Sequence, residues 1–106
     1  MNFHDFSKIF PMIEDDAFMK LVVSIHDDGL DHPIVTFEDQ ILDGRNRFAA
    51  CEKAGVKPRF VEYEGDDPLG YVVRSNLHRR HLTKDQRAEV VSKLAGVKVL
   101  PNTKMR

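Results

Sequence analysis

Several absences narrow what this chain can be. No apolar run approaches the roughly 18 residues that a membrane-spanning helix needs, and the polar start MNFHDFSK lacks the apolar middle of a signal peptide. A single cysteine excludes an internal disulfide framework. No H-E-x-x-H or C-x-x-C motif is present, which argues against a metal site built from protein groups alone. We therefore expect a cytoplasmic protein with no membrane segment.

Internal repeats and linkers are also missing. At 106 residues, 42% apolar and 31% charged, the chain has the size and composition of one globular domain with one core. Its charge is polarised, because residues 1–43 carry a formal charge of −8 and residues 44–106 carry +7. Either the two halves attract each other, within the domain or between copies, or the basic half binds anions.

Apolar periodicity and turn residues predict helices that alternate with strands. We expect helices at about residues 15–28, 44–54, 68–77 and 83–95, and strands at 33–37, from 41 onward, and at 59–63. The predicted helix starts are Asp15 or Asp16, Asp43, Asp67, and Thr83 with Gln86 in capping-box spacing. Alternation in the strand at 59–63 predicts one buried face. The last helix is expected to have its apolar side at Ala88, Val91, Leu94 and Ala95.

The stretch ILDGRNRFAAC, residues 41–51, places two arginines at a strand-to-helix turn. A glycine there lets the backbone approach a ligand closely, and the free amides of a helix start carry partial positive charge. The turn at Gly44 is therefore a candidate anion site. Arg45 and Arg47 splay apart on the first turn and can hold different oxygens of a polyphosphate. On spacing alone, both can equally be solvated surface residues.

A second basic stretch, RSNLHRRHLTKDQRA, covers the end of one predicted helix and the start of the next. Its density of cations indicates either a solvated surface or contact with anions. Asn76 offers an amide oxygen, a hard donor that suits a hydrated Mg²⁺ ion. The alternative is that Asn76 simply ends a helix whose dipole the neighbouring arginines complement.

Together with GLDHPI, these two stretches resemble the three boxes of the ParB/sulfiredoxin superfamily, in particular its ParB-like amino-terminal domain. The resemblance implies a small α/β (α+β) fold in which helices flank a short mixed sheet. It also implies binding of a nucleoside triphosphate, CTP or ATP, with Mg²⁺. It divides the chain into a lead-in (1–8), the ParB-like domain (9–95) and a tail (96–106) that is interpreted as the start of a following segment.

The resemblance also implies roles for individual residues. The implied nucleotide-binding residues are Gly44, Arg45, Asn46, Arg47, Asn76 and Arg79, with Asn76 as the metal ligand. The implied nucleic-acid contacts are Arg74, Arg80, Lys84 and Arg87. Because one triphosphate with its metal needs both boxes, we expect Gly44 and Asn76 to be adjacent in space. We expect Arg47 and Arg79 to be partly exposed, with little part in stability.

Four departures from the family modify these expectations. The family's Gly-Glu-Arg-Arg is Gly-Arg-Asn-Arg here. Ser75 stands where partition proteins have a glutamate that assists hydrolysis, so we expect binding without efficient turnover. His32 stands where glutamine is usual, which leaves cytosine selectivity open. Arg45 replaces the catalytic cysteine of sulfiredoxin and Cys51 is expected to be a core residue, so sulfiredoxin activity is not expected.

Three functions remain open. The first is a nucleotide-binding module of a partition, plasmid-maintenance or phage regulatory protein, alone or as a homodimer, that acts on DNA directly or through a separate reader. The chain ends at Arg106 without a complete reader, so we expect a fragment or a stand-alone regulator. The second is an NTPase, phosphotransferase or nuclease with Asp43 or Glu62 as base. The third is a structural or antagonist protein without nucleotide.

Overall fold

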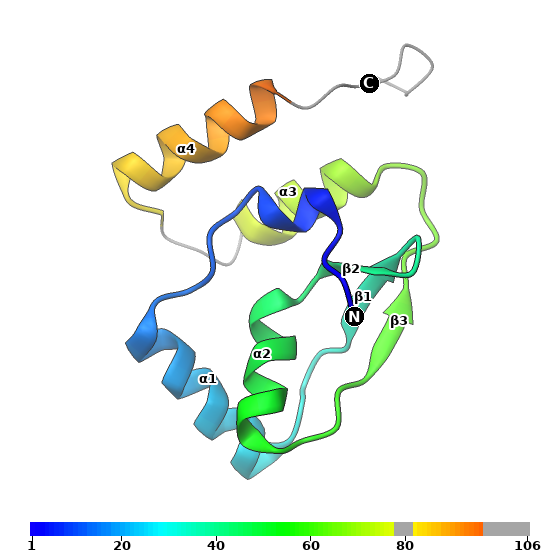
Figure 1. Ribbon diagram of the computed structural model, residues 1–106, viewed down its shortest axis with the longest axis vertical. Coiled ribbons are helices and arrows are strands. Elements are labelled where there is room, and N and C mark those ends of the chain that lie inside the picture. The colour runs from blue at the N-terminus through cyan, green and yellow to red at the C-terminus, as the bar shows by residue number, and fades with distance from the viewer. Residues whose placement is uncertain (78–81, 97–106) are drawn as a thin grey trace.

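The computed structural model of the protein describes residues 1–77 and 82–96, which form an α+β fold (Figure 1). In chain order, its elements are the 3-10 helix η1 (Asp5–Lys8), α1 (Asp15–Asp28), β1 (Ile34–Phe37), β2 (Gln40–Asp43), α2 (Arg45–Ala54), β3 (Phe60–Glu62), α3 (Pro68–Leu77) and α4 (Lys84–Ala95). The expected order of helices and strands is confirmed. None of the helices in these residues is long and apolar enough to cross a membrane.

The three strands form a mixed sheet in the order β2-β1-β3. The central strand β1 runs antiparallel to β2 and parallel to β3. Glu38 and Asp39 make the tight turn between β1 and β2, and both have positive φ. The register shifts between Val35 and Thr36, which places a bulge next to Asp43 at the end of β2. The expected short mixed sheet is confirmed, and its irregular end leads directly into the glycine turn.

The start of the chain is built into this fold. The His4 amide donates to the Ile41 carbonyl, and the Ile41 amide donates to the Asn2 carbonyl, both at 2.8 Å. His4 then begins η1, because its Nδ1 accepts a hydrogen bond of 3.1 Å from the Phe6 amide. The segment that the sequence sets apart as a lead-in is therefore part of the folded unit.

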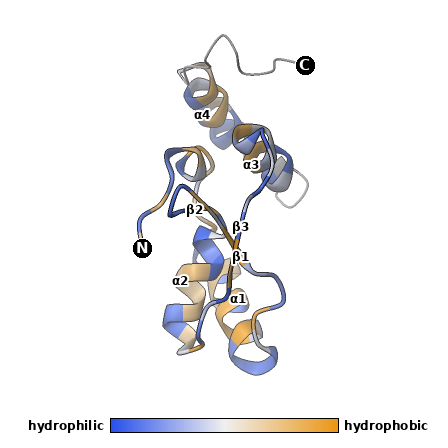
Figure 2. Ribbon diagram, turned by 90° about the vertical axis from the view of Figure 1, so that its right-hand side faces the viewer, coloured by the Kyte–Doolittle hydropathy of each residue, from blue (hydrophilic) through white to orange (hydrophobic). Residues whose placement is uncertain are grey.

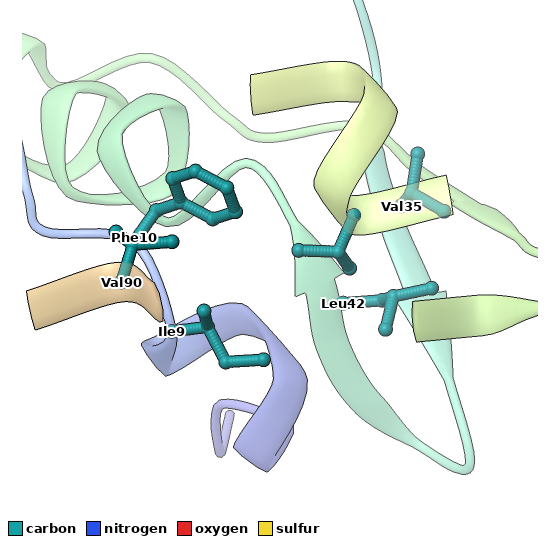
Figure 3. Packing of buried hydrophobic residues seen from close by; sticks show 6 residues of the cluster. Ile9, Phe10, Val35, Leu42 and Val90 are labelled. Atoms are coloured by element: carbon teal, nitrogen blue, oxygen red, sulfur yellow. The ribbon is translucent and has the colours of Figure 1, made fainter. Parts of the chain in front are cut away.

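Two apolar clusters hold the helices in place. The larger joins η1, the sheet, α3 and α4 (Figure 3), and its buried members are Ile9, Phe10, Val35, Leu42, Val72 and Val90. The smaller lies between α1 and α2, and its buried members are Val22, Ile25, Ala50 and Cys51. Cys51 is fully buried, so its expected core role is confirmed. Figure 2 shows the strands between the α1–α2 pair on one side and the α3 and α4 helices on the other.

The predictions of which apolar side chains are buried are wrong for β3 and for α4. All three residues of β3 are exposed, including Phe60 and Val61, because neither apolar cluster covers this strand, whereas the other outer strand, β2, is buried against the larger cluster. On α4, Val90 is 4% exposed and Val91 is 64% exposed. The helix therefore packs through Val90, with Leu94 against the same cluster, and leaves Val91 in solvent.

The predicted N-cap residues are correct for two helices and wrong for two, although the predicted ranges of the helices agree closely with the structure. The Gly70 amide donates to Asp67 Oδ1 at 3.0 Å at the start of α3, and Thr83 with Gln86 forms the expected capping box before α4. By contrast, Glu14 precedes α1 and Gly44 precedes α2, and neither makes a side-chain cap. Asp43 does not cap α2 because it is still a residue of β2.

Candidate functional site

The turn from β2 into α2 has the backbone geometry of an anion site. Gly44 has φ of 108°, in the left-handed region, where an L side chain costs about 1 to 2 kcal/mol. A Cβ at this position would also lie 3.4 Å from three atoms of Ile34. The first intrahelical bond runs from the Phe48 amide to the Gly44 carbonyl. The amides of Arg45 and Asn46 therefore have no acceptor within the helix and present the positive end of its dipole.

Two cavities open beside this turn. The smaller has a volume of about 30 Å³, and its lining includes Gly44, Arg45 and Asn76. The larger has a volume of about 350 Å³, and its lining includes Arg47 and again Asn76. Asp43 and Asn46 line both cavities. The structure thus brings the glycine turn and the asparagine of α3 together, as expected from the two sequence boxes.

Asn76 lines both cavities, and one side of its amide is used within α3. Its Nδ2 donates to the Val72 carbonyl at 2.8 Å, one turn earlier in α3. Within residues 1–77 and 82–96, the oxygen of the same amide accepts no hydrogen bond. Because Asn76 lines both cavities, an amide oxygen of this kind can serve a ligand or a hard cation.

Arg47 is placed differently from the expectation. Its side chain is only 12% exposed, and Nη1 donates to the Pro33 carbonyl at 2.7 Å and, more weakly, to the His32 carbonyl at 3.4 Å. Its Nη2 lies 3.4 Å from Oδ2 of Asp43, whose side chain is 9% exposed. Arg47 is therefore more buried than expected and is bound to the protein, while its contribution to stability stays a prediction. Arg47 ties the start of β1 to the end of β2.

Arg45 and Asn46 also have partners inside the protein. Arg45 Nη2 donates to the Phe10 carbonyl, and its guanidinium lies 5.8 Å from the centre of the Phe3 ring. Burial lowers the pKa of Arg45 from its usual value. Asn46 Oδ1 accepts a hydrogen bond of 3.1 Å from the Ile13 amide. Both side chains thus hold the segment before α1 against the glycine turn.

The other predicted site residues are spread more widely. Arg74 is exposed at the end of α3, 3.6 Å from Asp67, and Lys84 and Arg87 are exposed on the first turns of α4. Arg79 and Arg80 lie outside the described residues. Glu62, one candidate base, is exposed on β3, and neither it nor Ser75 lines the two cavities.

Sequence reasoning missed several of the lining residues. Ser7 and Phe10 reach the smaller cavity from the start of the chain. The wall of the larger cavity comes from α1 and the loop that follows it, and includes Leu21, Ser24, Ile25, Leu30 and Asp31. The amphipathic pattern of α1 indicates its buried face, but it does not indicate that part of this face borders a cavity.

Comparison with known sequences adds no relative. No protein-family model matches the chain, and no curated protein matches it. The functional argument therefore depends on the geometry of the turn, the two cavities and the motifs themselves.

Proposed function

We propose that this chain is a nucleotide-binding domain that holds a nucleoside triphosphate with Mg²⁺ beside the Gly44 turn. One observation carries the proposal: residues of the helix start and Asn76 line the same cavities, Gly44 with Asn76 in the smaller and Asn46 with Asn76 in the larger. Backbone amides at a helix start suit phosphate oxygens, and an amide oxygen suits the metal that accompanies them. The resemblance of the same residues to the ParB-like boxes supports the assignment.

The size of the larger cavity is consistent with a ligand of this kind. Its volume of about 350 Å³ lies at the lower end of the range, about 300 to 1,000 Å³, that small-molecule sites occupy. The phosphates would lie against the amides of Arg45 and Asn46. Arg47 would contribute charge from a fixed position, because its guanidinium is already bound to the protein.

Mg²⁺ suits this site only if phosphate oxygens of the nucleotide bind it together with Asn76. The residues that the structure describes contain no cluster of three or more His, Cys, Asp or Glu side chains suited to a metal. Mg²⁺ usually keeps several waters and is bound by one or two protein oxygens together with substrate phosphates. Asn76 would supply such an oxygen. Mg²⁺ bound there would neutralise phosphate charge.

The wider role that we propose is that of a cytoplasmic ParB-like regulator or partition component. It would act on DNA directly or through an attached or associated reader, as a monomer or a homodimer. Arg74, Lys84 and Arg87 support this role, because they are exposed cations on two successive helices. Contacts from such side chains to phosphates make DNA binding weaken with salt.

Equilibrium binding of the four ribonucleoside triphosphates, each with and without Mg²⁺, tests the proposal. We expect at least one nucleotide to bind saturably, and we expect Mg²⁺ to raise its affinity. Asn76→Ala should reduce the increase in nucleotide affinity that Mg²⁺ causes. The control is Asn2→Ala, which changes an exposed asparagine that lines neither cavity and should leave that increase unchanged. Absence of binding to all four nucleotides would contradict the proposal.

A second candidate, phosphoryl transfer or hydrolysis at the same site, rests on Asp43. Its carboxylate is nearly buried and lines both cavities, so it is better placed than Glu62 to act as a base. The guanidinium of Arg47 lies beside this carboxylate, 3.4 Å from Oδ2. Product formation that is lost in Asp43→Asn, with nucleotide still bound, would place this candidate first.

A further inference from the structure

The free edge of the sheet is a feature of this fold that the proposed function does not use. Strand β3 (Phe60–Glu62) is an outer strand, and within the described residues it pairs only with β1 (Figure 1). Phe60 is 41% exposed and Val61 is 46% exposed. None of the residues of β3 lines either cavity. A backbone edge and apolar side chains are therefore exposed together, outside the candidate nucleotide site.

Three residues in and beside β3 direct their backbone groups toward β1. The Ile34 amide donates to the Arg59 carbonyl at 2.7 Å, and the Tyr63 amide donates to the Thr36 carbonyl at 2.8 Å. In a parallel ladder, the residues that bond to one neighbouring strand alternate along the chain. The register with β1 makes Val61 the third such residue. The backbone groups of every second residue, from Arg59 to Tyr63, are therefore used inside the sheet.

The two residues between them, Phe60 and Glu62, direct their backbone groups to the open side. Each presents an amide and a carbonyl, and these groups make no hydrogen bond within the part of the chain that the structure describes. A row of unpaired backbone groups beside exposed apolar side chains is a template for a further strand. Pro58 precedes the strand and has no amide hydrogen, so this edge offers no donor before Phe60.

We propose that this edge pairs with the same edge of a second copy of the chain, so that the sheets of the two copies join into one continuous sheet. A twofold axis perpendicular to the sheet makes the two β3 strands antiparallel. With Val61 on the axis, Phe60 of each copy lies opposite Glu62 of the other. Every outward amide of one strand then has an outward carbonyl of the other strand opposite it.

The charge of Glu62 and the position of Pro58 favour this register over its neighbours. With Glu62 on the axis, two carboxylates would lie directly opposite each other, which is unfavourable. With Phe60 on the axis, Glu62 would lie opposite Pro58, which cannot donate a hydrogen bond. The register centred on Val61 avoids both conflicts, and it packs the exposed Val61 side chains of the two copies against each other.

The length of the strand sets the expected strength of the interface. Stable protein interfaces bury about 1,200 Å² or more, and a strand of three residues is short for that area. We therefore expect a reversible dimer whose population rises with protein concentration. The dimer does not depend on the proposed function, because β3 lines neither cavity.

Disulfide trapping tests the register, because a residue on the axis meets its own counterpart. In a non-hydrogen-bonded antiparallel pair the Cα atoms lie about 4.5 Å apart, within the range that a disulfide spans. Val61→Cys should therefore form a linked dimer under a mild oxidant. Glu62→Cys should stay monomeric, because its Cα atoms would be about 7 to 8 Å apart. The second control is Val23→Cys, which changes a similarly exposed valine on α1, and the fully buried Cys51 should take no part.

Sedimentation equilibrium of nucleotide-free protein over a range of concentrations measures the strength of the dimer. Val61→Lys places two ammonium groups opposite each other on the axis and should raise the dissociation constant about fivefold. Val23→Lys makes the same change on α1 and should leave the constant unchanged. Linkage of Glu62→Cys or Val23→Cys to the same extent as Val61→Cys would overturn the proposed interface, and so would an unmodified chain that stays monomeric at every concentration.

Discussion

Replacement of Arg47 by alanine should destabilise the fold, although sequence alone makes this residue a surface cation. The Arg47 side chain is 12% exposed, and its guanidinium bridges two segments. It donates to the Pro33 carbonyl at 2.7 Å and lies 3.4 Å from the Asp43 carboxylate. Alanine removes both contacts. The loop before β1 and the last residue of β2 then lose their shared partner.

The cost can be worked from these contacts. Loss of one partner of a buried ion pair costs about 3 to 5 kcal/mol, because the other charge stays in a poor environment. The distance of 3.4 Å to Asp43 is long, which favours the lower end of that range. The bond to the Pro33 carbonyl is short and charge-assisted, and contributes to the same total. We therefore expect Arg47→Ala to lower the free energy of unfolding by about 3 kcal/mol.

Urea denaturation followed by circular dichroism measures this quantity. The matched control is Arg74→Ala, because Arg74 is 62% exposed and only 3.6 Å from an exposed aspartate. This control should lose at most about 1 kcal/mol. In the double variant Asp43→Ala/Arg47→Ala, the loss should be smaller than the sum of the single losses, since the two side chains share one interaction. Equal stability of Arg47→Ala and Arg74→Ala would refute the bridging role.

Three further predictions concern the turn and the core. Gly44→Ala should lower the free energy of unfolding by about 1 to 2 kcal/mol in urea denaturation, because φ is 108° and the new Cβ meets Ile34. Val90→Ala should cost about 2 kcal/mol and speed hydrogen exchange in α4, while the exposed Val91→Ala should change neither. Equal effects of the two valine changes would contradict the packing of α4. Burial raises the pKa of the Cys51 thiol, so alkylation should be slow until the chain unfolds, and the stability from the neutral thiol should be present at neutral pH and decline as the pH rises through the raised pKa. Rapid alkylation of the folded protein would contradict that burial.

Features that depend on a few neighbouring residues could be predicted from the sequence. The capping box at Thr83 and the aspartate cap before α3 need contacts only within one turn, and both are present. The boundaries of α1 and the αL glycine after α2 follow from local rules of the same kind. The mixed sheet itself goes beyond local pattern, and its prediction rested on the resemblance to the ParB-like domain.

Features that depend on the tertiary neighbours could not be predicted. The mixture of charged and apolar residues at 59–63 is typical of a half-buried strand, but no helix or apolar cluster covers Phe60 and Val61, and both stay exposed. Val90 and Val91 are adjacent on α4, and only the position of the larger cluster decides which one is buried. In the sequence Arg47 has the pattern of a free cation, because Asp43 has the position of a helix cap and nothing indicates that the Pro33 carbonyl lies within reach.

Some residues of the candidate site could be predicted from the sequence, and others could not. The motifs identified Gly44 and Asn76, and the fold brings both to the same small cavity. The contribution of Ser7 and Phe10 could not be seen, because it requires the chain start to cross beside β2. Asp31 belongs to the GLDHPI box, but the sequence does not show that the loop after α1 lines the larger cavity.

The most direct test of the central claim is a titration of ¹⁵N-labelled protein with ATP and with CTP in the presence of Mg²⁺, followed by NMR. If a triphosphate binds at the turn, the backbone amides of Gly44, Arg45 and Asn46 and the side-chain amide of Asn76 should shift together and saturate with one dissociation constant. Omission of Mg²⁺ should reduce the shift of Asn76 most strongly. Absence of shifts, or shifts confined to the exposed basic residues of α4, would contradict a shared site at the turn.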